Sequence, residues 1–163
     1  NLPSKYGSKF INISIAVDLL IKAKIKVKKI SNFYTTPSYP NKKLPEYTNI
    51  GLLVDYKYDY KNLFKIILFI EDKIGRIKTK KNDPRVCDID VIDFNGLINK
   101  SLKYQLPHPR SHLRNFVLYP IKEIDPNWVH PILNKNVDYL INKLSQNSRI
   151  EITRLRKSVI MKP

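Results

Sequence analysis

The sequence predicts an α+β domain of the ferredoxin-like β-α-β-β-α-β type. Segments with helical apolar spacing and β-rich segments follow one another in the order helix, strand, strand, helix, strand. The chain has 163 residues, without repeats or a composition break that would mark a linker, so we expect a single domain over residues 1–163. The first strand of the plan is missing from the sequence, and we expect a strand of about 5–10 residues upstream of Asn1.

The first half of the chain contains one predicted helix and two predicted β regions. Residues 10–20 carry apolar side chains at helical spacing. Residues 25–36 are rich in β-branched and aromatic side chains and stop before Pro37, and residues 38–45 read as a loop with two prolines and an asparagine. Residues 47–56 alternate, which predicts a strand with one core face. That core face holds Ile50, Leu52, Val54 and Tyr56.

The second half begins with the clearest helix of the chain. Residues 60–74 carry an apolar stripe and are followed by a glycine where a helix commonly ends. A basic loop is expected over residues 76–83, a strand over 86–94 and a further helix near 137–144. His- and Pro-rich short elements lie between these last two, and the basic tail, residues 148–163, has no clear pattern.

The composition limits the protein class. Hydrophobic residues make up 42% of the chain, which excludes a disordered segment. The longest apolar runs are too short to cross a bilayer, so we expect no membrane association. The single cysteine, Cys87, cannot form an internal disulfide and fits a reducing cytoplasm.

The formal net charge of +16 has three interpretations. A basic chain can bind nucleic acid, it can bind a small polyanion such as a nucleotide, or its lysines can simply cover solvated faces. The lysines are scattered apart from short clusters at residues 26–29 and 78–81, which favours the third interpretation for most of them. Charge alone does not indicate the function.

A pair of aspartates is the sharpest chemical feature. Asp88 and Asp90 lie two apart in the predicted strand and therefore face the same side, opposite Cys87, Ile89 and Val91. Two adjacent carboxylates repel each other unless a cation neutralises them. Magnesium commonly combines carboxylates with substrate phosphates, so the pair suits a magnesium site. The alternative is a pair of exposed acids on an edge strand, and the short pattern alone favours that alternative.

Several longer motifs occur around this pair. They are FYTTP (33–37), PEYTN (45–49), IEDKIGR (70–76), DPRVCDIDVIDF (83–94) and PHPRSHLRNFVLYPIKEIDP (107–126). In order and approximate spacing they resemble the 6-hydroxymethyl-7,8-dihydropterin pyrophosphokinase family, over most of the chain up to about Leu144. Their combination is much more specific than any one of them.

The resemblance implies an ATP-dependent transferase of folate biosynthesis. Such an enzyme moves pyrophosphate from ATP to 6-hydroxymethyl-7,8-dihydropterin and releases AMP. The resemblance also implies two magnesium ions at Asp88 and Asp90 that bridge the ATP phosphates and the pterin hydroxymethyl group. The expected partners are these small molecules, without nucleic acid, a membrane or an obligate protein partner.

The resemblance also assigns roles to other residues of this sequence, at the positions that match the family's motifs. Two arginines, Arg76 and Arg85, are implied to act on the phosphates as catalytic residues. The implied ATP contacts are Glu71, Arg76, Arg85, Lys103, Gln105, His108 and Arg114. The implied pterin pocket is formed by Thr36, Pro37, Tyr39, Tyr47, Asn49 and Phe116. Arginine forks suit phosphate oxygens, and the donor and acceptor of an asparagine amide match a pterin edge.

Two other functions stay open on the sequence. A ferredoxin-like RNA-binding module would explain the charge, but the exposed aromatic pattern of such modules is absent and acids on its binding face would repel phosphate. The other alternative is an inactive relative that lost catalysis along with its first strand. Two further departures from the family concern the loop over the nucleotide: Lys78 replaces a frequent arginine and loses its bidentate fork, and Asn82–Asp83 replace a frequent tryptophan and glycine.

Overall fold

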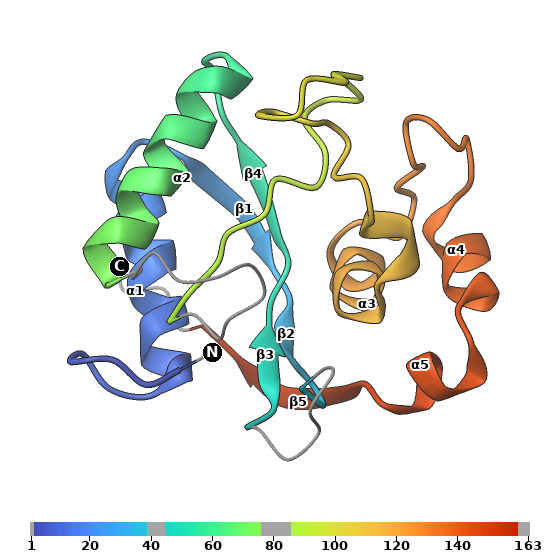
Figure 1. Cartoon of the computed structure of the whole chain (residues 1–163), viewed down its shortest axis with the longest axis horizontal. Helices are drawn as coiled ribbons and strands as arrows, with labels where there is room; N and C mark the ends of the chain where they lie inside the picture. The colour runs from blue at the N-terminus through green and yellow to red at the C-terminus, as the bar shows by residue number, and fades with distance from the viewer. Residues whose placement is uncertain (1, 39–44, 76–85, 160–163) are drawn as a thin grey trace. The chain divides into compact units, whose positions relative to one another are not determined.

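The computed structural model describes residues 2–38, 45–75 and 86–159 (Figure 1). Its contacts divide the chain into two compact units. The first comprises residues 1–27, 54–89 and 159–163, and the second comprises residues 28–53 and 90–158. Helices and antiparallel strand pairs are both present, so the predicted α+β class is confirmed. The strands form a two-stranded sheet of order β1-β4 and a three-stranded sheet of order β3-β2-β5.

The elements follow the predicted order over the first half of the chain and depart from it later. The described elements are α1 (Lys9–Lys22), β1 (Lys26–Ile30), β2 (Asn32–Thr36), β3 (Tyr47–Asn49), β4 (Leu52–Asp55), α2 (Tyr60–Ile74), the 3-10 helix η1 (Ser111–Leu113), α3 (Asn115–Ile124), α4 (Val137–Lys143), α5 (Gln146–Ile150) and β5 (Thr153–Ser158).

The first unit is built around α1 and α2, which pack side by side (Figure 1). The predicted helix over residues 60–74 is confirmed at both ends. Asp59 caps its start by accepting the Asn62 N–H at 3.0 Å. Gly75 ends it with a φ of 104°, a left-handed conformation that favours glycine. The stripe that α2 buries consists of Leu63, Ile67, Ile70, Glu71 and Ile74.

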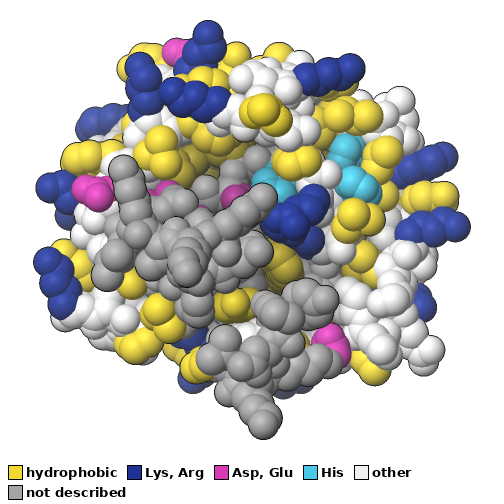
Figure 2. Space-filling model, in the orientation of Figure 1, with side chains coloured by type: hydrophobic (Ala, Val, Ile, Leu, Met, Phe, Trp, Pro, Cys, Tyr) yellow, Lys and Arg dark blue, Asp and Glu magenta, His cyan; other side chains and the backbone are white. Residues whose placement is uncertain are grey.

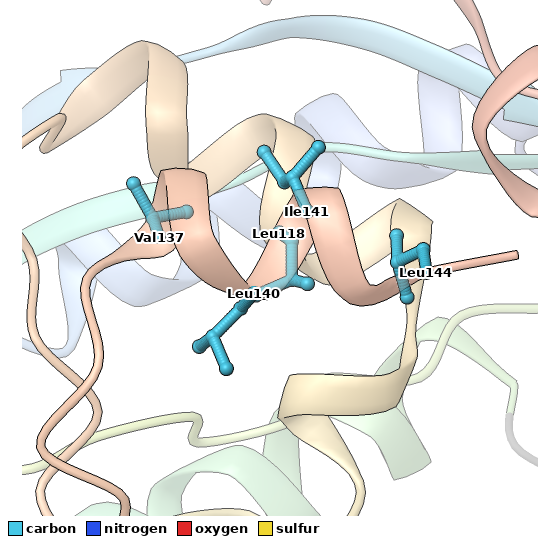
Figure 3. Close-up of a cluster of buried hydrophobic side chains, with 5 residues drawn as sticks. All are labelled: Leu118, Val137, Leu140, Ile141 and Leu144. Carbon is cyan, nitrogen blue, oxygen red and sulfur yellow. The ribbon is translucent and has the colours of Figure 1, made fainter.

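The second unit places α3 against the sheet and α4 against α3. Strand β2 pairs antiparallel with β3 on one side and with β5 on the other. Figure 3 shows how Leu118 of α3 points into a group of apolar side chains from α4 and its C-terminal end. All of them are buried, and this burial stabilises the packing of the two helices. The cluster consists of Leu118, Val137, Leu140, Ile141 and Leu144.

The single alternating strand predicted over residues 47–56 is wrong: two strands, β3 and β4, stand in its place. The chain leaves the extended pattern at Gly51, whose C=O and N–H both bond to Ser31. A Cβ on Gly51 would lie 2.9 Å from the Cβ of Pro120, so only glycine lets α3 approach this closely. The predicted core face is half-buried as a result.

The strand predicted over residues 86–94 is also wrong. Its side chains alternate as predicted, with Cys87 buried, Asp88 and Asp90 exposed, and Ile89 half-buried. Among the described residues, however, its backbone pairs with no strand ladder. A strand needs a partner as well as a pattern, so the segment is extended but irregular.

The C-terminal half contains two features that the sequence reading did not predict. The FVLYP run lies in a helix, α3, which includes Pro120. The tail, which had no clear pattern, contains α5 and then β5, and β5 completes the three-stranded sheet beside β2.

Candidate functional site

Four predicted site residues meet within the second unit. The Nη1 atom of Arg114 lies 3.6 Å from Oδ2 of Asp90, and Nε2 of His108 lies 4.0 Å from the same oxygen. The guanidinium of Arg114 also stacks over the ring of Phe116, 5.4 Å from its centre. A carboxylate, an imidazole, a guanidinium and an aromatic ring are therefore gathered in one place.

The local chain orients His108. Its backbone N–H donates to the C=O of Ile92 at 2.9 Å, which ties it to the segment that carries Asp90. Its Nδ1 accepts the N–H of Arg110 at 3.2 Å, and its Nε2 lies 3.5 Å from Nη1 of Arg114, a group that can only donate. Burial lowers the pKa of His108 below its usual value; Asp90 opposes this effect, and Arg114 and Arg110 add to it. Burial thus favours the neutral form of His108.

The Asp90 carboxylate remains accessible. It is 45% exposed, and its contact with Arg114 is long. A surface ion pair of this kind contributes at most about 1 kcal/mol. A cation or a phosphate-bound metal can therefore compete for Asp90 without unfolding the site.

The predicted pterin residues share one face of the sheet in the same unit. The register places Thr36 opposite Tyr47 and Tyr34 opposite Asn49, and directly opposed residues point to the same side. Tyr34 identifies that side, because its hydroxyl donates to Glu123 of α3 at 2.6 Å. The face therefore looks toward α3, whose first turn carries Phe116.

The predicted pterin residues on this sheet face are buried to different extents. Thr36 is buried, whereas Pro37, Tyr47 and Asn49 are half-buried and keep accessible surface for a ligand. The hydroxyl of Ser38 bonds to the C=O of Pro45 and closes the base of the connection between β2 and β3. Tyr39 lies within that connection, outside the described residues.

Two further predicted residues lie in the first unit. Glu71 is 2% exposed at the end of α2, and its Oε1 accepts the backbone N–H of Ile89 at 2.8 Å. Asp88, the residue before Ile89, is exposed. The preceding Cys87 is buried, which raises the pKa of its thiol and makes it a poor nucleophile.

The remaining predicted site residues do not contact this group in the part of the chain that the structure describes. Lys103 and Gln105 are exposed on a loop whose ends are joined by paired hydrogen bonds between Asn99 and Leu106. Arg76 and Arg85, predicted to be catalytic, lie outside the described residues. Their roles stay predictions.

The carboxylates of Asp88 and Asp90 suit magnesium better than a metal ion that is held by protein ligands alone. Within residues 2–38, 45–75 and 86–159, no group of three or more His, Cys, Asp and Glu side chains is placed to hold a metal ion. The exposed Asp88 and Asp90 offer hard oxygen ligands but too few of them to complete a site alone. Magnesium sites often consist of one or two carboxylates completed by substrate phosphates and water, and these residues suit such a site.

Comparison with known proteins shows which family the chain belongs to. The model of the family described as 7,8-dihydro-6-hydroxymethylpterin-pyrophosphokinase (HPPK) matches residues 1–126. The chain belongs to the HPPK family. The predicted family is thereby confirmed.

Individual relatives in this family include both long and short proteins. The chain is 36% identical over 131 residues to the folic acid synthesis protein FOL1 of Dictyostelium discoideum, covering 80% of this chain and 20% of that protein. It is 32% identical over 127 residues to the 2-amino-4-hydroxy-6-hydroxymethyldihydropteridine pyrophosphokinase of Synechocystis, covering 78% of this chain and 65% of that protein. The chain is 28% identical over 134 residues to the protein of the same name from Aquifex aeolicus, covering 82% of this chain and 83% of that protein. The chain thus spans only part of the first two relatives.

Sequence reasoning missed a contact that supports the site of this HPPK family member. Asp93 accepts the indole N–H of Trp128 at 2.8 Å through Oδ2 and the N–H of Gly96 at 2.8 Å through Oδ1. It therefore anchors the end of the segment that carries Asp90. The third aspartate after D-x-D and the single tryptophan of the chain were the available signals, but nothing in their spacing indicates that they meet.

Basic side chains are visible on one face of this HPPK family member. In Figure 2, Lys and Arg side chains occur at several separate places on the visible face instead of forming one continuous patch. No helix within the described part of the chain combines the length and the apolar character needed to span a membrane.

Proposed function

We propose that this chain transfers pyrophosphate from ATP to 6-hydroxymethyl-7,8-dihydropterin and releases AMP, the pyrophosphokinase step of folate biosynthesis. Membership of the HPPK family supports the reaction. The observation that carries the proposal is the meeting of Asp90, His108, Arg114 and Phe116 beside a sheet face with Tyr47 and Asn49. This combination offers phosphate-binding groups and an aromatic ring within one unit.

In the proposed reaction, the pterin hydroxymethyl oxygen attacks the β-phosphorus of ATP, and AMP leaves with the α-phosphate. The protein mainly positions two substrates and neutralises charge. Phe116 and the sheet face with Thr36, Tyr47 and Asn49 are proposed to hold the pterin, and Pro37 and Tyr39 are proposed as further pterin contacts. Arg114 and His108 are proposed to bind phosphate oxygens, and Arg76, Arg85, Lys103 and Gln105 are proposed to complete the nucleotide site.

Asp88 and Asp90 are proposed to hold two magnesium ions. Bound magnesium would neutralise the charge that shifts onto the phosphate oxygens and would acidify the attacking hydroxyl. No separate general base is proposed. Arg114 is then proposed to exchange its long contact with Asp90 for a phosphate, because an ion pair of this kind is weak.

The wider setting follows from the same proposal. The chain acts as a single pyrophosphokinase domain on small molecules, without nucleic acid, a membrane or an obligate protein partner. The ferredoxin-like plan is proposed as its architecture. The single cysteine is consistent with a cytoplasmic location.

The test is an AMP-release assay with ATP, magnesium and the pterin alcohol. Asp90→Ala should lower turnover about 100-fold or more, because metal-assisted stabilisation is worth several kcal/mol. Its metal-free stability should change by less than about 1 kcal/mol, while MgATP should raise its melting temperature less than that of the unmodified protein.

Asp138→Ala is the matched control. Asp138 is another exposed aspartate in the same unit, paired with Lys122, and its loss should leave turnover unchanged. A fully active Asp90→Ala variant would end the proposed metal role. Absence of AMP release from the unmodified chain would instead support an inactive relative.

A further inference from the structure

Glu71 occupies a position that is unfavourable for a carboxylate. It lies in the last turn of α2, where a negative charge opposes the helix dipole, and it is only 2% exposed. Its neighbours in that turn, Asp72 and Lys73, are exposed. Burying a carboxylate costs free energy unless hydrogen bonds compensate for the lost water. The burial therefore calls for a specific contact.

That contact is the hydrogen bond from the backbone N–H of Ile89 to Oε1 of Glu71, 2.8 Å long. Ile89 is the residue between Asp88 and Asp90. Both partners belong to the first unit, so the bond is internal to one compact body. A charged acceptor makes such a bond shorter and stronger than one between neutral groups.

The surrounding backbone increases the importance of this bond. In a paired strand, ladder hydrogen bonds on both sides of each residue hold the direction of its side chain. The segment 86–94 has no such ladder among the described residues. The Glu71 carboxylate orients the peptide plane between Asp88 and Ile89, and through it the directions in which the flanking aspartates leave the backbone.

We propose that Glu71 is a positioning residue for the aspartate pair: it takes the place of a neighbouring strand and holds the Ile89 amide. This inference rests on the proposed function, in which Asp88 and Asp90 hold magnesium. A displacement of the ligands by about 1 Å can cost about 100-fold in rate, so an oriented backbone matters for the reaction.

Two substitutions separate this role from direct use of the charge. Glu71→Gln keeps an acceptor oxygen at the same reach and removes the charge. Glu71→Asp keeps the charge and withdraws the acceptor by one methylene. A positioning role predicts that Gln is tolerated and Asp is not, whereas a role as a nucleotide or metal ligand predicts the opposite. Asp72→Asn and Asp72→Glu are the matched controls, on the exposed acid of the same turn.

The first readout is amide hydrogen exchange of Ile89, measured by NMR in the metal-free protein. In Glu71→Asp the exchange should accelerate about tenfold or more, because the amide loses its acceptor. In Glu71→Gln and in both Asp72 variants the exchange should stay close to that of the unmodified protein. Thermal melts establish that each variant is folded before it is compared.

The second readout is binding of Mn²⁺ together with the α,β-methylene analogue of ATP, followed by electron paramagnetic resonance. Changing a group that orients a metal ligand typically weakens metal affinity about 10- to 100-fold, which is the loss expected for Glu71→Asp. Glu71→Gln should stay within about threefold of the unmodified protein, since its acceptor remains. In turnover, Glu71→Asp should lower kcat with little change in KM for ATP.

Two results would overturn the proposal. One is a Glu71→Gln variant that binds Mn²⁺ as poorly as Glu71→Asp while its Ile89 amide stays protected, since the charge would then be what matters. The other is loss of Ile89 protection in Glu71→Asp with unchanged Mn²⁺ binding, since the contact would then be merely structural. Neither readout needs turnover, so failure of the proposed reaction is recognised separately, from the AMP-release assay on the unmodified chain.

Discussion

Replacing Glu123 should destabilise the second unit more than replacing any exposed acid on it. Glu123 lies on α3 and accepts hydrogen bonds from two strands of the sheet. Oε1 accepts from the backbone N–H of Asn32 at 3.0 Å, from its Nδ2 at 2.6 Å and from Arg154 at 3.1 Å, and Oε2 accepts from the Tyr34 hydroxyl at 2.6 Å. One carboxylate thus joins α3 to β2 and β5.

The size of the effect follows from the burial of the donors. Tyr34 is 5% exposed and Asn32 is half-buried, so Glu123→Ala leaves three donor groups of these two residues poorly solvated, at up to about 1–3 kcal/mol each. Arg154 is largely exposed and contributes little. Because Glu123 itself is 20% exposed, water partly replaces it, and we expect a loss of about 2–4 kcal/mol in the free energy of unfolding. At about 2–4 °C per kcal/mol, the melting temperature should fall about 5–15 °C.

The effect should also depend on pH. Burial alone would raise the pKa of Glu123, but the hydrogen bonds from Tyr34, Asn32 and Arg154 outweigh burial and lower this pKa below the usual 4.5. A carboxyl with a lowered folded-state pKa stabilises the protein above its usual pKa, and this stabilisation is lost as the pH falls through the lowered value. The difference between the unmodified protein and Glu123→Ala should therefore narrow below about pH 4.5.

Urea unfolding across this pH range measures both quantities. Lys122→Ala is the control, because Lys122 is the neighbouring residue on α3, and its ion pair with Asp138 is about half exposed on both sides. That substitution should cost less than about 1 kcal/mol. If Glu123→Ala were no more destabilising than Lys122→Ala at neutral pH, the assignment of Glu123 as the link between helix and sheet would be wrong.

Three further predictions concern other parts of the second unit. Asn49→Ala should weaken pterin binding by about 1–3 kcal/mol and leave ATP binding nearly intact, because the amide partners of a bound pterin are lost; calorimetry showing equal pterin affinity would refute this. Gly51→Ala should destabilise by about 1–3 kcal/mol, because the new Cβ meets Pro120 at 2.9 Å, and denaturant unfolding measures this change. Burial, with a smaller contribution from His112, lowers the pKa of His130 against the opposing effect of Asp93, so stability should fall as the pH drops below the usual 6.5. His130→Gln should reduce that loss in unfolding curves at roughly pH 7.5 and 5.5, and an unchanged slope would count against the assignment.

The helices of the first unit were predictable because their determinants are local. The stripe of α2, the cap at Asp59 and the glycine at position 75 lie within one continuous stretch. The alternation of Asp88 and Asp90 with Cys87 and Ile89 was equally visible in the sequence, and their burial confirms it.

The second unit was harder to predict because its elements depend on partners far away in the chain. The helix α3 contains Pro120, which removes one backbone donor and obscures the helical pattern, and its packing against β2, β3 and α4 supports it instead. Strand β5 was missed because its polar sequence has no alternating apolar face. Only its pairing with β2 makes it a strand.

For the candidate site, the sequence by itself determined the family and the types of side chain that the site contains. Both depend only on the order of the motifs and the identity of their residues, which the amino-acid sequence states directly. Only the tertiary structure decided that Asp90 meets His108 and Arg114, that Arg114 stacks on Phe116, and that Glu71 holds the Ile89 amide. These contacts join residues from separate elements. Their geometry follows from how helices and sheet pack, and no local pattern encodes that packing.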